Sequence, residues 1–344
     1  YPYVQLLTPH AKMITALVSK EFIARFGAAL EAEAKAAGKT VVFMTLPAEK
    51  GARLSPAERE KVDVMFFDRD MRFDEQLHDA YADALLKMDN LKWIHYTSSG
   101  IGQQLHIKEV NAKGIITTSS TGANAEPVAQ TGITRLLMLA RGFGTHIHNQ
   151  AKRQWKPIRG KALPDDLRGQ TLLLIGVGHI GKKVAAYAQA FGLNVIGVRR
   201  TPRQPDDTVN ELHPPEKLPE LYPRADWIML CCPLTKETEN LVNADAFKRM
   251  KKGVKLINIA RGEIVDDAAM LEALKTGQLS GAALDAHSQE PLSADSPLWD
   301  MPNVIISPHN ASASTGNEPR SAEMFVANFG HWARGEAMFN VQKF

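Results

Sequence analysis

Short apolar runs of strand length alternate with longer amphipathic stretches in the first part of the chain. The apolar runs cover residues 3–7, 40–44, 62–67 and 93–96. The spacing of apolar positions predicts a long helix within residues 14–37, ending near Gly38, and a second helix at residues 75–88. Strands separated by helices predict a parallel, doubly wound sheet with helices on its faces.

The pattern begins again after a polar stretch of small residues at 117–124. Pro127 suits the first turn of a helix, and residues 128–140 have the spacing of a long helix that leads into a second domain. Six strand candidates follow, at residues 171–175, 194–198, 226–231, 254–259, 281–284 and 304–307. An amphipathic helix at 323–334 is too short to form a domain and is expected to pack back onto the first one. We therefore expect two domains, 1–121 completed by 312–344, and 122–311.

The second domain opens on a glycine-rich turn between a strand and a helix. The strand covers residues 171–175, the helix covers residues 182–191, and the turn is Gly176-Val177-Gly178-His179-Ile180-Gly181. The glycines let the backbone turn sharply and let a pyrophosphate approach the amides at the N-terminus of the helix. An ordinary strand–helix turn is the alternative, but the strand before and the helix after favour a dinucleotide site.

A basic segment follows the second strand of this unit. In an NAD site an acidic residue about 20 residues past the glycines binds the ribose 2′-hydroxyl. Here the position holds Arg199-Arg200-Thr201-Pro202-Arg203. A guanidinium binds a 2′-phosphate with paired, charge-assisted hydrogen bonds, so Arg199, Arg200 and Arg203 favour NADP(H), with NAD(H) still possible. Asp206 and Asp207 lie past two prolines and are expected outside the pocket, and a solvated basic turn is the alternative.

Composition narrows the class of protein. The chain has 344 residues, of which 44% are hydrophobic and 23% charged, so it is long enough for two cores. A net charge of +3, carried by scattered basic residues, gives no reason to expect a nucleic-acid partner. No apolar run approaches the ~20 residues that span a bilayer, so no membrane partner is expected. The first residue is Tyr1, which leaves a removed signal segment open.

Cysteine and histidine usage points away from disulfides and metals. Cys231 and Cys232 are adjacent in an apolar, strand-like run, which provides neither a disulfide framework nor metal-ligand spacing. This pattern suits the reducing cytoplasm. His95, His146 and His148 lack a third ligand at a suitable spacing, so we expect no metal site.

Three chemically capable residues follow strand candidates in the second domain. Arg261 comes after residues 254–259, Glu290 after residues 281–284, and His309 after residues 304–307. In open α/β sheets, ligands bind outside the carboxyl ends of the strands, so all three could face one cleft. Taken singly, they could also be a turn cap, a loop acid and a core histidine.

These residues belong to motifs that occur together in one order. The motifs are the glycine turn, Cys232-Pro233-Leu234-Thr235, Asn258-Ile259-Ala260-Arg261-Gly262, Leu284-Asp285, Glu290-Pro291-Leu292, Ser296-Pro297-Leu298-Trp299, Pro302-Asn303-Val304 and Ser307-Pro308-His309. In this respect the chain resembles the D-isomer-specific 2-hydroxyacid dehydrogenases, especially their glyoxylate/hydroxypyruvate reductase branch. The resemblance covers residue 90 to the end and is weaker before it. It implies a flavodoxin-like substrate domain, a Rossmann cofactor domain and a cleft between them.

The resemblance also implies roles for the three residues. His309 would donate a proton to the carbonyl oxygen as hydride arrives at the same carbon. Glu290 would hold the imidazole and favour its protonated form. Arg261 would bind the substrate carboxylate and stabilise the developing alkoxide.

Further positions follow from the same resemblance. Asp285 and the backbone near Ala260 would hold the nicotinamide carboxamide, and Cys232 and Pro233 would line the cofactor site beside the glycine turn. Ser99, Gly100 and Ile101 would meet the substrate carboxylate through backbone amides. Two departures from the family pattern stand out, Gln130 and the segment 286–289, in which His287 is expected to be a wall residue of the site. A homodimer would form through the helix from Val128 and the segment 146–155.

Together these features predict an NADPH-dependent reductase of small 2-keto acids, such as glyoxylate or hydroxypyruvate, that gives the D-hydroxy acid. A phosphoglycerate-type dehydrogenase is an alternative, disfavoured by the basic cofactor turn and by the lack of an appended regulatory domain. A cofactor-sensing corepressor or scaffold with the same fold is another, because function belongs to sites rather than to folds.

Overall fold

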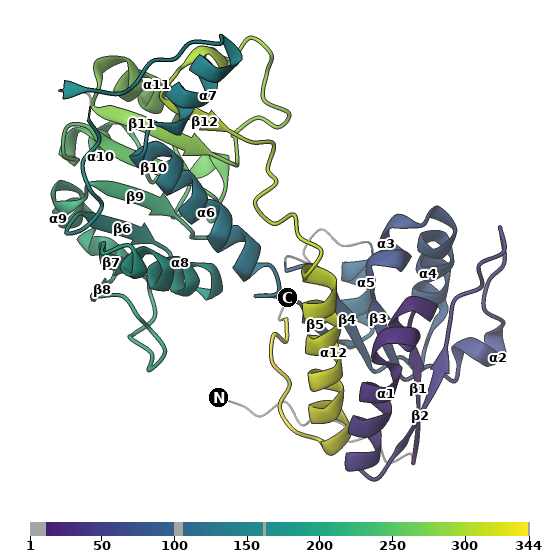
Figure 1. Ribbon diagram of the computed structural model, residues 1–344. Helices are drawn as coiled ribbons and strands as arrows, with labels where there is room; N and C mark the ends of the chain where they lie inside the picture. Colours follow the sequence, from purple (N-terminus) through teal and green to yellow (C-terminus); the bar gives the residue numbers. More distant parts are fainter. Residues whose placement is uncertain (1–11, 100–105, 161–162, 343–344) are drawn as a thin grey trace. The chain divides into compact units, whose positions relative to one another are not determined.

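The computed structural model describes residues 12–99, 106–160 and 163–342 (Figure 1). The strand expected at 3–7 therefore lies outside the described residues. The chain forms two compact units. Unit 1 contains the residues up to Ala123 and those from Ser314 onward, and unit 2 runs from Asn124 to Ala313.

Unit 1 is built on a parallel sheet of five strands in the order β2-β1-β3-β4-β5. Its strands are β1 (Met13–Leu17), β2 (Thr40–Met44), β3 (Val64–Phe67), β4 (Trp93–Tyr96) and β5 (Ile116–Ser119). All four residues of β3 and of β4 are buried, as expected for central strands with helices on both faces.

Helices cover both faces of this sheet. They are α1 (Lys20–Ala36), α2 (Pro56–Arg59), α3 (Arg69–Phe73), α4 (Glu75–Lys87), α5 (Ile107–Ala112) and the C-terminal α12 (Asn317–Arg334). On one face α1 and α12 run side by side (Figure 1), and Phe325 stacks on Phe66 and Trp93 with ring centroids 4.8 and 5.0 Å apart. On the other face Tyr81 of α4 stacks on Phe67 at 4.1 Å.

Two strands of unit 1 were not predicted. The helix predicted within residues 14–37 is present as α1, but Met13–Leu17 form β1 before it, and the helix begins after Ser19, whose hydroxyl accepts a hydrogen bond from the Phe22 N–H at 3.0 Å. Residues 116–119 form the edge strand β5, where a polar connection was expected. Thr117 and Thr118 are buried there. Threonine is β-branched and therefore favours a strand even though it is polar.

Unit 2 contains a seven-stranded parallel sheet in the order β12-β11-β10-β9-β6-β7-β8. The strands are β6 (Thr171–Ile175), β7 (Asn194–Val198), β8 (Glu211–His213), β9 (Trp227–Leu230), β10 (Val254–Asn258), β11 (Leu279–Leu284) and β12 (Val304–Ile306). The six predicted strands are present, and the short edge strand β8 was missed because it carries no apolar run. The prediction of two parallel-sheet α/β domains is thus confirmed.

The helices of unit 2 also lie on both faces of its sheet. Its α-helices are α6 (Ala125–Ala140), α7 (Phe143–Ala151), α8 (His179–Ala190), α9 (Leu218–Leu221), α10 (Ala244–Arg249) and α11 (Asp267–Thr276). α6 and α8 pack on one face, and α9, α10 and α11 pack on the other. None of the helices in the described ranges combines the length and the apolar character needed to cross a bilayer.

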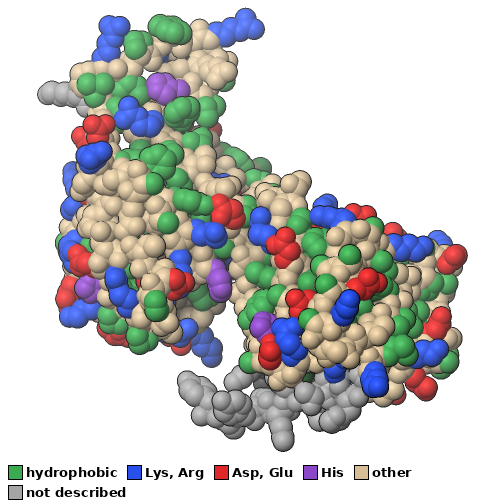
Figure 2. Space-filling view, turned by 60° about the horizontal axis from the view of Figure 1, so that its bottom comes forward, with side chains coloured by type: hydrophobic (Ala, Val, Ile, Leu, Met, Phe, Trp, Pro, Cys, Tyr) green, Lys and Arg blue, Asp and Glu red, His purple; other side chains and the backbone are tan. Residues whose placement is uncertain are grey.

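Acidic and basic side chains are interspersed on the face seen in Figure 2.

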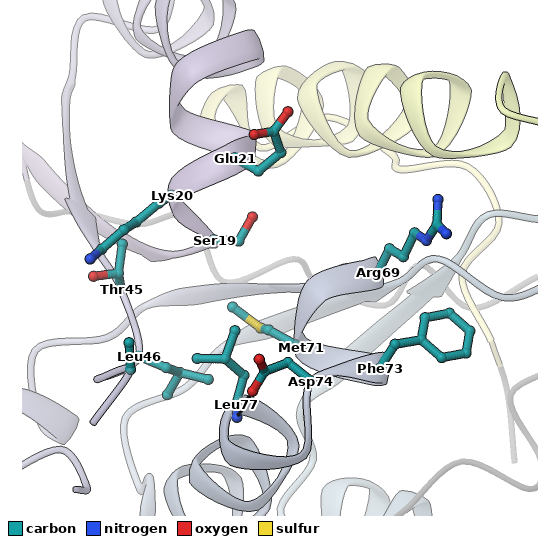
Figure 3. A pocket seen from close by; sticks show the side chains of 11 residues that line it. Ser19, Lys20, Glu21, Thr45, Leu46, Arg69, Met71, Phe73, Asp74 and Leu77 are labelled. Atoms are coloured by element: carbon teal, nitrogen blue, oxygen red, sulfur yellow. Dashed lines mark hydrogen bonds between the residues drawn. The ribbon is translucent and has the colours of Figure 1, made fainter. Parts of the chain in front are cut away.

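Unit 1 has a cavity of about 390 Å³ at the carboxyl ends of β1, β2 and β3 (Figure 3). Apolar side chains such as Leu46, Met71 and Leu77 line it together with two cations and two carboxylates: Lys20, Arg69, Glu21 and Asp74. Of the predicted site residues that the structure describes, none lines this cavity.

Candidate active site

Three adjacent strands of unit 2 bring the predicted chemistry to one edge of the sheet. β10, β11 and β12 are parallel neighbours, so their carboxyl ends lie together. Arg261 follows β10, Glu290 follows β11 and His309 follows β12. This is the edge at which open α/β sheets bind ligands.

The loop after β10 is fixed by Asn258 and by a glycine. The side chain of Asn258 accepts a hydrogen bond from the Ala260 N–H at 3.0 Å and donates one to the Arg261 carbonyl at 2.8 Å. A Cβ atom at Gly262 would lie 1.9 Å from the carbonyl carbon of His287, so only glycine allows the β10 and β11 loops to approach this closely. Arg261 is exposed, and its Nη1 donates to the Ala260 carbonyl at 2.7 Å.

Glu290 and His309 form a hydrogen-bonded pair. Nδ1 of His309 lies 2.8 Å from Oε2 of Glu290 and 3.0 Å from Oε1, which assigns the proton to Nδ1 and leaves Nε2 for a ligand. Their side chains are 42% and 38% exposed, so solutes can reach the pair. Burial raises the pKa of Glu290, but hydrogen bonds from the His287 N–H and from His309 outweigh it, and the pKa is lowered overall.

Asp285 fixes the turn that carries His309. The backbone of His309 has a φ of 52°, a left-handed conformation, and its N–H donates to the Asp285 carbonyl at 2.8 Å. The buried Asp285 carboxylate accepts hydrogen bonds from the N–H groups of Asn310 and Ala311 at 3.0 and 2.8 Å, and from the Ser307 hydroxyl. Burial raises the pKa of Asp285, whereas these bonds and the nearby Arg135 lower it, and the lowering prevails.

Arg135 was missed by the sequence analysis. It lies on α6 and is 7% exposed. Its Nη2 donates to Oδ1 of Asp285 at 3.1 Å and to the Ser307 hydroxyl. Its Nη1 is buried and has no partner among the described residues. The sequence contained a signal for a buried charge, because Arg135 lies beside Leu136 on the apolar face of the predicted helix.

His287 lies deeper than expected. The side chain is buried, and its Nε2 is 3.3 Å from the Ser307 carbonyl oxygen. Its backbone N–H donates to Oε1 of Glu290 at 3.0 Å. His287 thus packs behind the Glu290–His309 pair and contacts it through the backbone.

The glycine turn has the geometry of a phosphate-binding turn. Gly176 has a φ of 103°, and a Cβ there would lie 2.5 Å from the backbone nitrogen of Cys232, so the turn lies against the backbone of Cys231 and Cys232. A Cβ at Gly181 would lie 2.1 Å from the Gly176 carbonyl oxygen. A Cβ at Gly178 would meet no atom of the described residues within 4 Å, so this side of the turn is open to a ligand.

The residues at the turn fit a dinucleotide. α8 starts at His179, next to the half-buried Ile180, and its N-terminus receives no capping hydrogen bond from a side chain in the part of the chain that the structure describes. Its first amides can therefore bind an anion such as a pyrophosphate. Near the other end of the predicted site, the unpartnered Nη1 of Arg135 offers donors beside Asp285.

The basic segment differs from the prediction in one respect. Arg199 donates to both oxygens of Asp207, at 2.9 and 2.6 Å, and to the Val177 carbonyl at 2.9 Å. The hydrogen bonds from Arg199 lower the pKa of Asp207 to about 2. The segment after the two prolines thus folds back onto Arg199, a pairing that the sequence did not predict. Asp206 likewise returns and pairs with Lys182 at 2.6 Å.

The other two arginines are exposed. Arg203 donates through Nη2 to the Val209 carbonyl at 2.6 Å. Arg200 lies near enough to Glu237 to contribute to the lowered pKa of that carboxyl, after hydrogen bonds from Thr235 and the backbone. Of the three, Arg199 is thus the one whose guanidinium fork is occupied by a carboxylate of the protein.

The predicted substrate loop is only partly described. The Ser99 carbonyl accepts a hydrogen bond from the Thr121 hydroxyl at 3.1 Å. Gly100 and Ile101 lie outside the described residues. His95 is fully buried between Thr118 and Ser120, and burial lowers its pKa to about 3. Within the ranges that the structure covers, no three His, Cys, Asp or Glu side chains are grouped to hold a metal ion.

Comparisons with known proteins identify the family of the chain. Residues 133–311 match the family model "D-isomer specific 2-hydroxyacid dehydrogenase, NAD binding domain". The chain is 35% identical to a glyoxylate reductase of Korarchaeum cryptofilum over 69% of this chain and 72% of that protein. It is 31% identical to a D-3-phosphoglycerate dehydrogenase of Rattus norvegicus over 76% of this chain and 48% of that protein.

A solved structure extends the likeness to nearly the whole chain. It is a D-isomer-specific 2-hydroxyacid dehydrogenase from Xanthobacter autotrophicus Py2 in complex with NADPH and MES. The TM-score is 0.69 at 25% identity, covering 97% of this chain and 98% of that one. The resemblance found in the sequence is confirmed: the chain belongs to the D-isomer-specific 2-hydroxyacid dehydrogenase family.

Proposed function

We propose that the protein reduces small 2-keto acids of the glyoxylate or hydroxypyruvate type to D-2-hydroxy acids, with NADPH preferred over NADH. The observation that carries this proposal is the contact between Glu290 and His309, which is 2.8 Å long and open to solvent. It lies at the carboxyl edge of the sheet, where Arg261 also lies. The glyoxylate reductases among its relatives support the choice of substrate class.

His309 acts as the proton donor in this scheme. A bound reduced nicotinamide would supply a hydride to the carbonyl carbon of the substrate. Nε2 of His309 gives its proton to the carbonyl oxygen, so a C–H and an O–H bond form while the C=O double bond becomes a C–O single bond. Glu290 keeps the imidazole oriented through Nδ1 and compensates its positive charge before the transfer.

Arg261 binds the substrate and stabilises charge on its oxygen. Its guanidinium is exposed and retains donors beyond the bond to the Ala260 carbonyl. A planar fork of donors matches a carboxylate with two parallel hydrogen bonds. Gly262 positions this side chain by letting its loop contact the backbone of residues 287 and 288.

The cofactor preference rests on Arg200 and Arg203 more than on Arg199. Arg199 is bound to Asp207 and to the glycine turn, and it holds the segment 199–207 in place. That pairing also occupies the Asp207 carboxylate, which is then a poor acceptor for a ribose 2′-hydroxyl. The exposed guanidinium groups of Arg200 and Arg203 provide positive charge for a 2′-phosphate, and the Xanthobacter relative was solved with NADPH.

We also propose a homodimer formed through unit 2. α7 and the segment after it present Phe143, Ile147 and Trp155, which are 49%, 51% and 97% exposed. Such large apolar side chains are costly to leave in water and are typical of an interface.

A panel of keto acids tests the proposed function. Oxidation of NADPH and of NADH should be followed with glyoxylate, hydroxypyruvate, pyruvate and 3-phosphohydroxypyruvate. We expect the highest kcat/KM with glyoxylate or hydroxypyruvate and NADPH. A preference for the phosphorylated substrate would favour the phosphoglycerate alternative, which the rat relative supports. No turnover with any substrate, despite cofactor binding, would favour a cofactor-sensing protein.

A further inference from the structure

The turn that carries His309 depends on a buried charge. Asp285 receives the N–H groups of Asn310 and Ala311 and the Ser307 hydroxyl, so its carboxylate fixes residues on both sides of His309. A carboxylate in such a buried place is stable in its ionised form only if it is compensated by hydrogen bonds or by a positive charge.

The positive charge comes from a distant part of the chain. Among the described residues, the basic side chain that contacts this carboxylate is Arg135. It lies on α6, 150 residues before Asp285. Its Nη2 also donates to Ser307, two residues before His309. The side chains of both partners are almost fully buried, at 9% and 2% exposed, so solvent cannot replace the contact.

A second contact ties α6 to the same turn. The hydroxyl of Thr131, one helical turn before Arg135, donates to the Ala311 carbonyl at 3.2 Å. α6 therefore contacts both ends of the turn, Ser307 through Arg135 and Ala311 through Thr131. Through Arg135 it also contacts Asp285, which binds the turn. α6 starts at the first chain connection between the two units, and Ala311 lies just before the second.

We propose that Arg135 is a positioning residue for the proton donor. Through Asp285 and Ser307 it fixes the left-handed turn at His309, and so it sets where the imidazole stands against the substrate. The role of His309 in this inference rests on the proposed function, whereas the effect of Arg135 on the turn does not. A displacement of about 1 Å of a reacting group can cost about 100-fold in rate.

The test compares Arg135→Met with two other variants of the full-length protein. Arg135→Met keeps the length of the side chain and removes its charge and donors. Arg135→Lys keeps the charge without the planar fork. Leu136→Ala is the matched control, because Leu136 is fully buried on the same helix and is not a partner of Asp285.

Two readouts separate positioning from general damage. Hydrogen–deuterium exchange, followed by mass spectrometry, reports the amides of residues 307–313 with no need for a substrate. Steady-state kinetics report kcat and the KM for the keto acid. Urea unfolding checks whether Arg135→Met and Leu136→Ala lose comparable stability.

We expect Arg135→Met to speed exchange at Asn310 and Ala311 at least tenfold and to lower kcat about 100-fold, with KM changed less than threefold. Arg135→Lys should lie between this variant and the wild type in both readouts. Leu136→Ala should leave both near the wild type. Wild-type exchange in Arg135→Met, or the same changes in Leu136→Ala, would overturn the proposal.

The two proposals fail in different ways. If the wild-type protein reduces no keto acid, the proposed function falls, and the exchange readout still decides whether Arg135 fixes the turn. If Arg135→Met does not fold, the comparison is made with Arg135→Lys, whose exchange at residues 310–311 should still exceed that of the wild type. Equal exchange in that variant would contradict the proposal.

Discussion

Gly262 lies directly against the backbone of His287, where a single added methyl group would come within 1.9 Å of the carbonyl carbon. This contact joins the loop of Arg261 to the loop of Glu290, and Glu290 in turn contacts His309 at 2.8 Å. The candidate site therefore depends on a backbone approach that only glycine permits.

We predict that Gly262→Ala lowers kcat/KM for the keto acid by about 100-fold or more, because the Arg261 loop must move away from the β11 loop. Steady-state kinetics and urea unfolding check this. Gly27→Ala is a suitable control, since a Cβ there meets Ile23 at an ordinary 3.4 Å in the middle of α1. Wild-type kinetics in Gly262→Ala would show that the contact does not position Arg261.

The two adjacent arginines of the cofactor segment should respond differently to substitution. Arg200→Ala should raise the Kd for NADPH about tenfold and leave the Kd for NADH nearly unchanged. The reason is that only NADPH has the 2′-phosphate that the Arg200 guanidinium would bind. Arg199→Ala should weaken both cofactors, because Asp207 and the Val177 carbonyl lose their donor. Fluorescence titration measures the four affinities. Equal effects of Arg200→Ala on both cofactors would contradict the assignment.

The Arg199–Asp207 pair should make stability depend on pH. The pKa of Asp207 is lowered to about 2 in the folded protein, below the ~3.9 of an unfolded chain. Its contribution is therefore present above about pH 4 and is lost as the pH falls toward 2. Asp207→Asn should cost about 2 kcal/mol at pH 7 and much less near pH 2.5.

Urea unfolding of the wild type and of Asp207→Asn at both pH values measures this difference. Asp206→Asn is the control, because Asp206 is exposed and pairs at the surface with Lys182. A difference between wild type and Asp207→Asn that stays constant with pH would show that this pair is not its source.

The exposed apolar side chains of α7 predict the oligomeric state. The wild type should behave as a dimer in light scattering coupled to gel filtration. Ile147→Asp should shift it toward a monomer, because a carboxylate would be buried without a partner in the interface. Leu234→Asp, at another exposed apolar side chain of unit 2, should leave the mass unchanged. A monomeric wild type would remove the proposed dimer.

Local chemistry explains what the sequence could predict. The strand, glycine turn and helix around Gly176 and Gly181 follow from residues next to one another, and six strands of unit 2 follow from compact apolar runs. The strand at Met13–Leu17 was missed because a short apolar run next to an amphipathic helix has no distinct period. Ser19 was the N-cap signal that separates them.

Contacts between distant residues explain what was missed. Arg135 has its partner 150 residues away, and the fork of Arg199 is filled by Asp207 only because a proline-containing segment folds back. His287 follows a predicted strand, yet its ring turns inward toward Ser307, a residue of the next strand's loop. No spacing in the chain encodes such pairings.

Substitution of His309 tests the central claim most directly. His309→Gln should be assayed with NADPH and the best keto acid of the panel, while fluorescence titration follows NADPH binding. If the imidazole delivers the proton, kcat should fall by about 100-fold to 10,000-fold, and the Kd for NADPH should stay within a few fold of the wild type. Wild-type kcat in this variant would contradict the account.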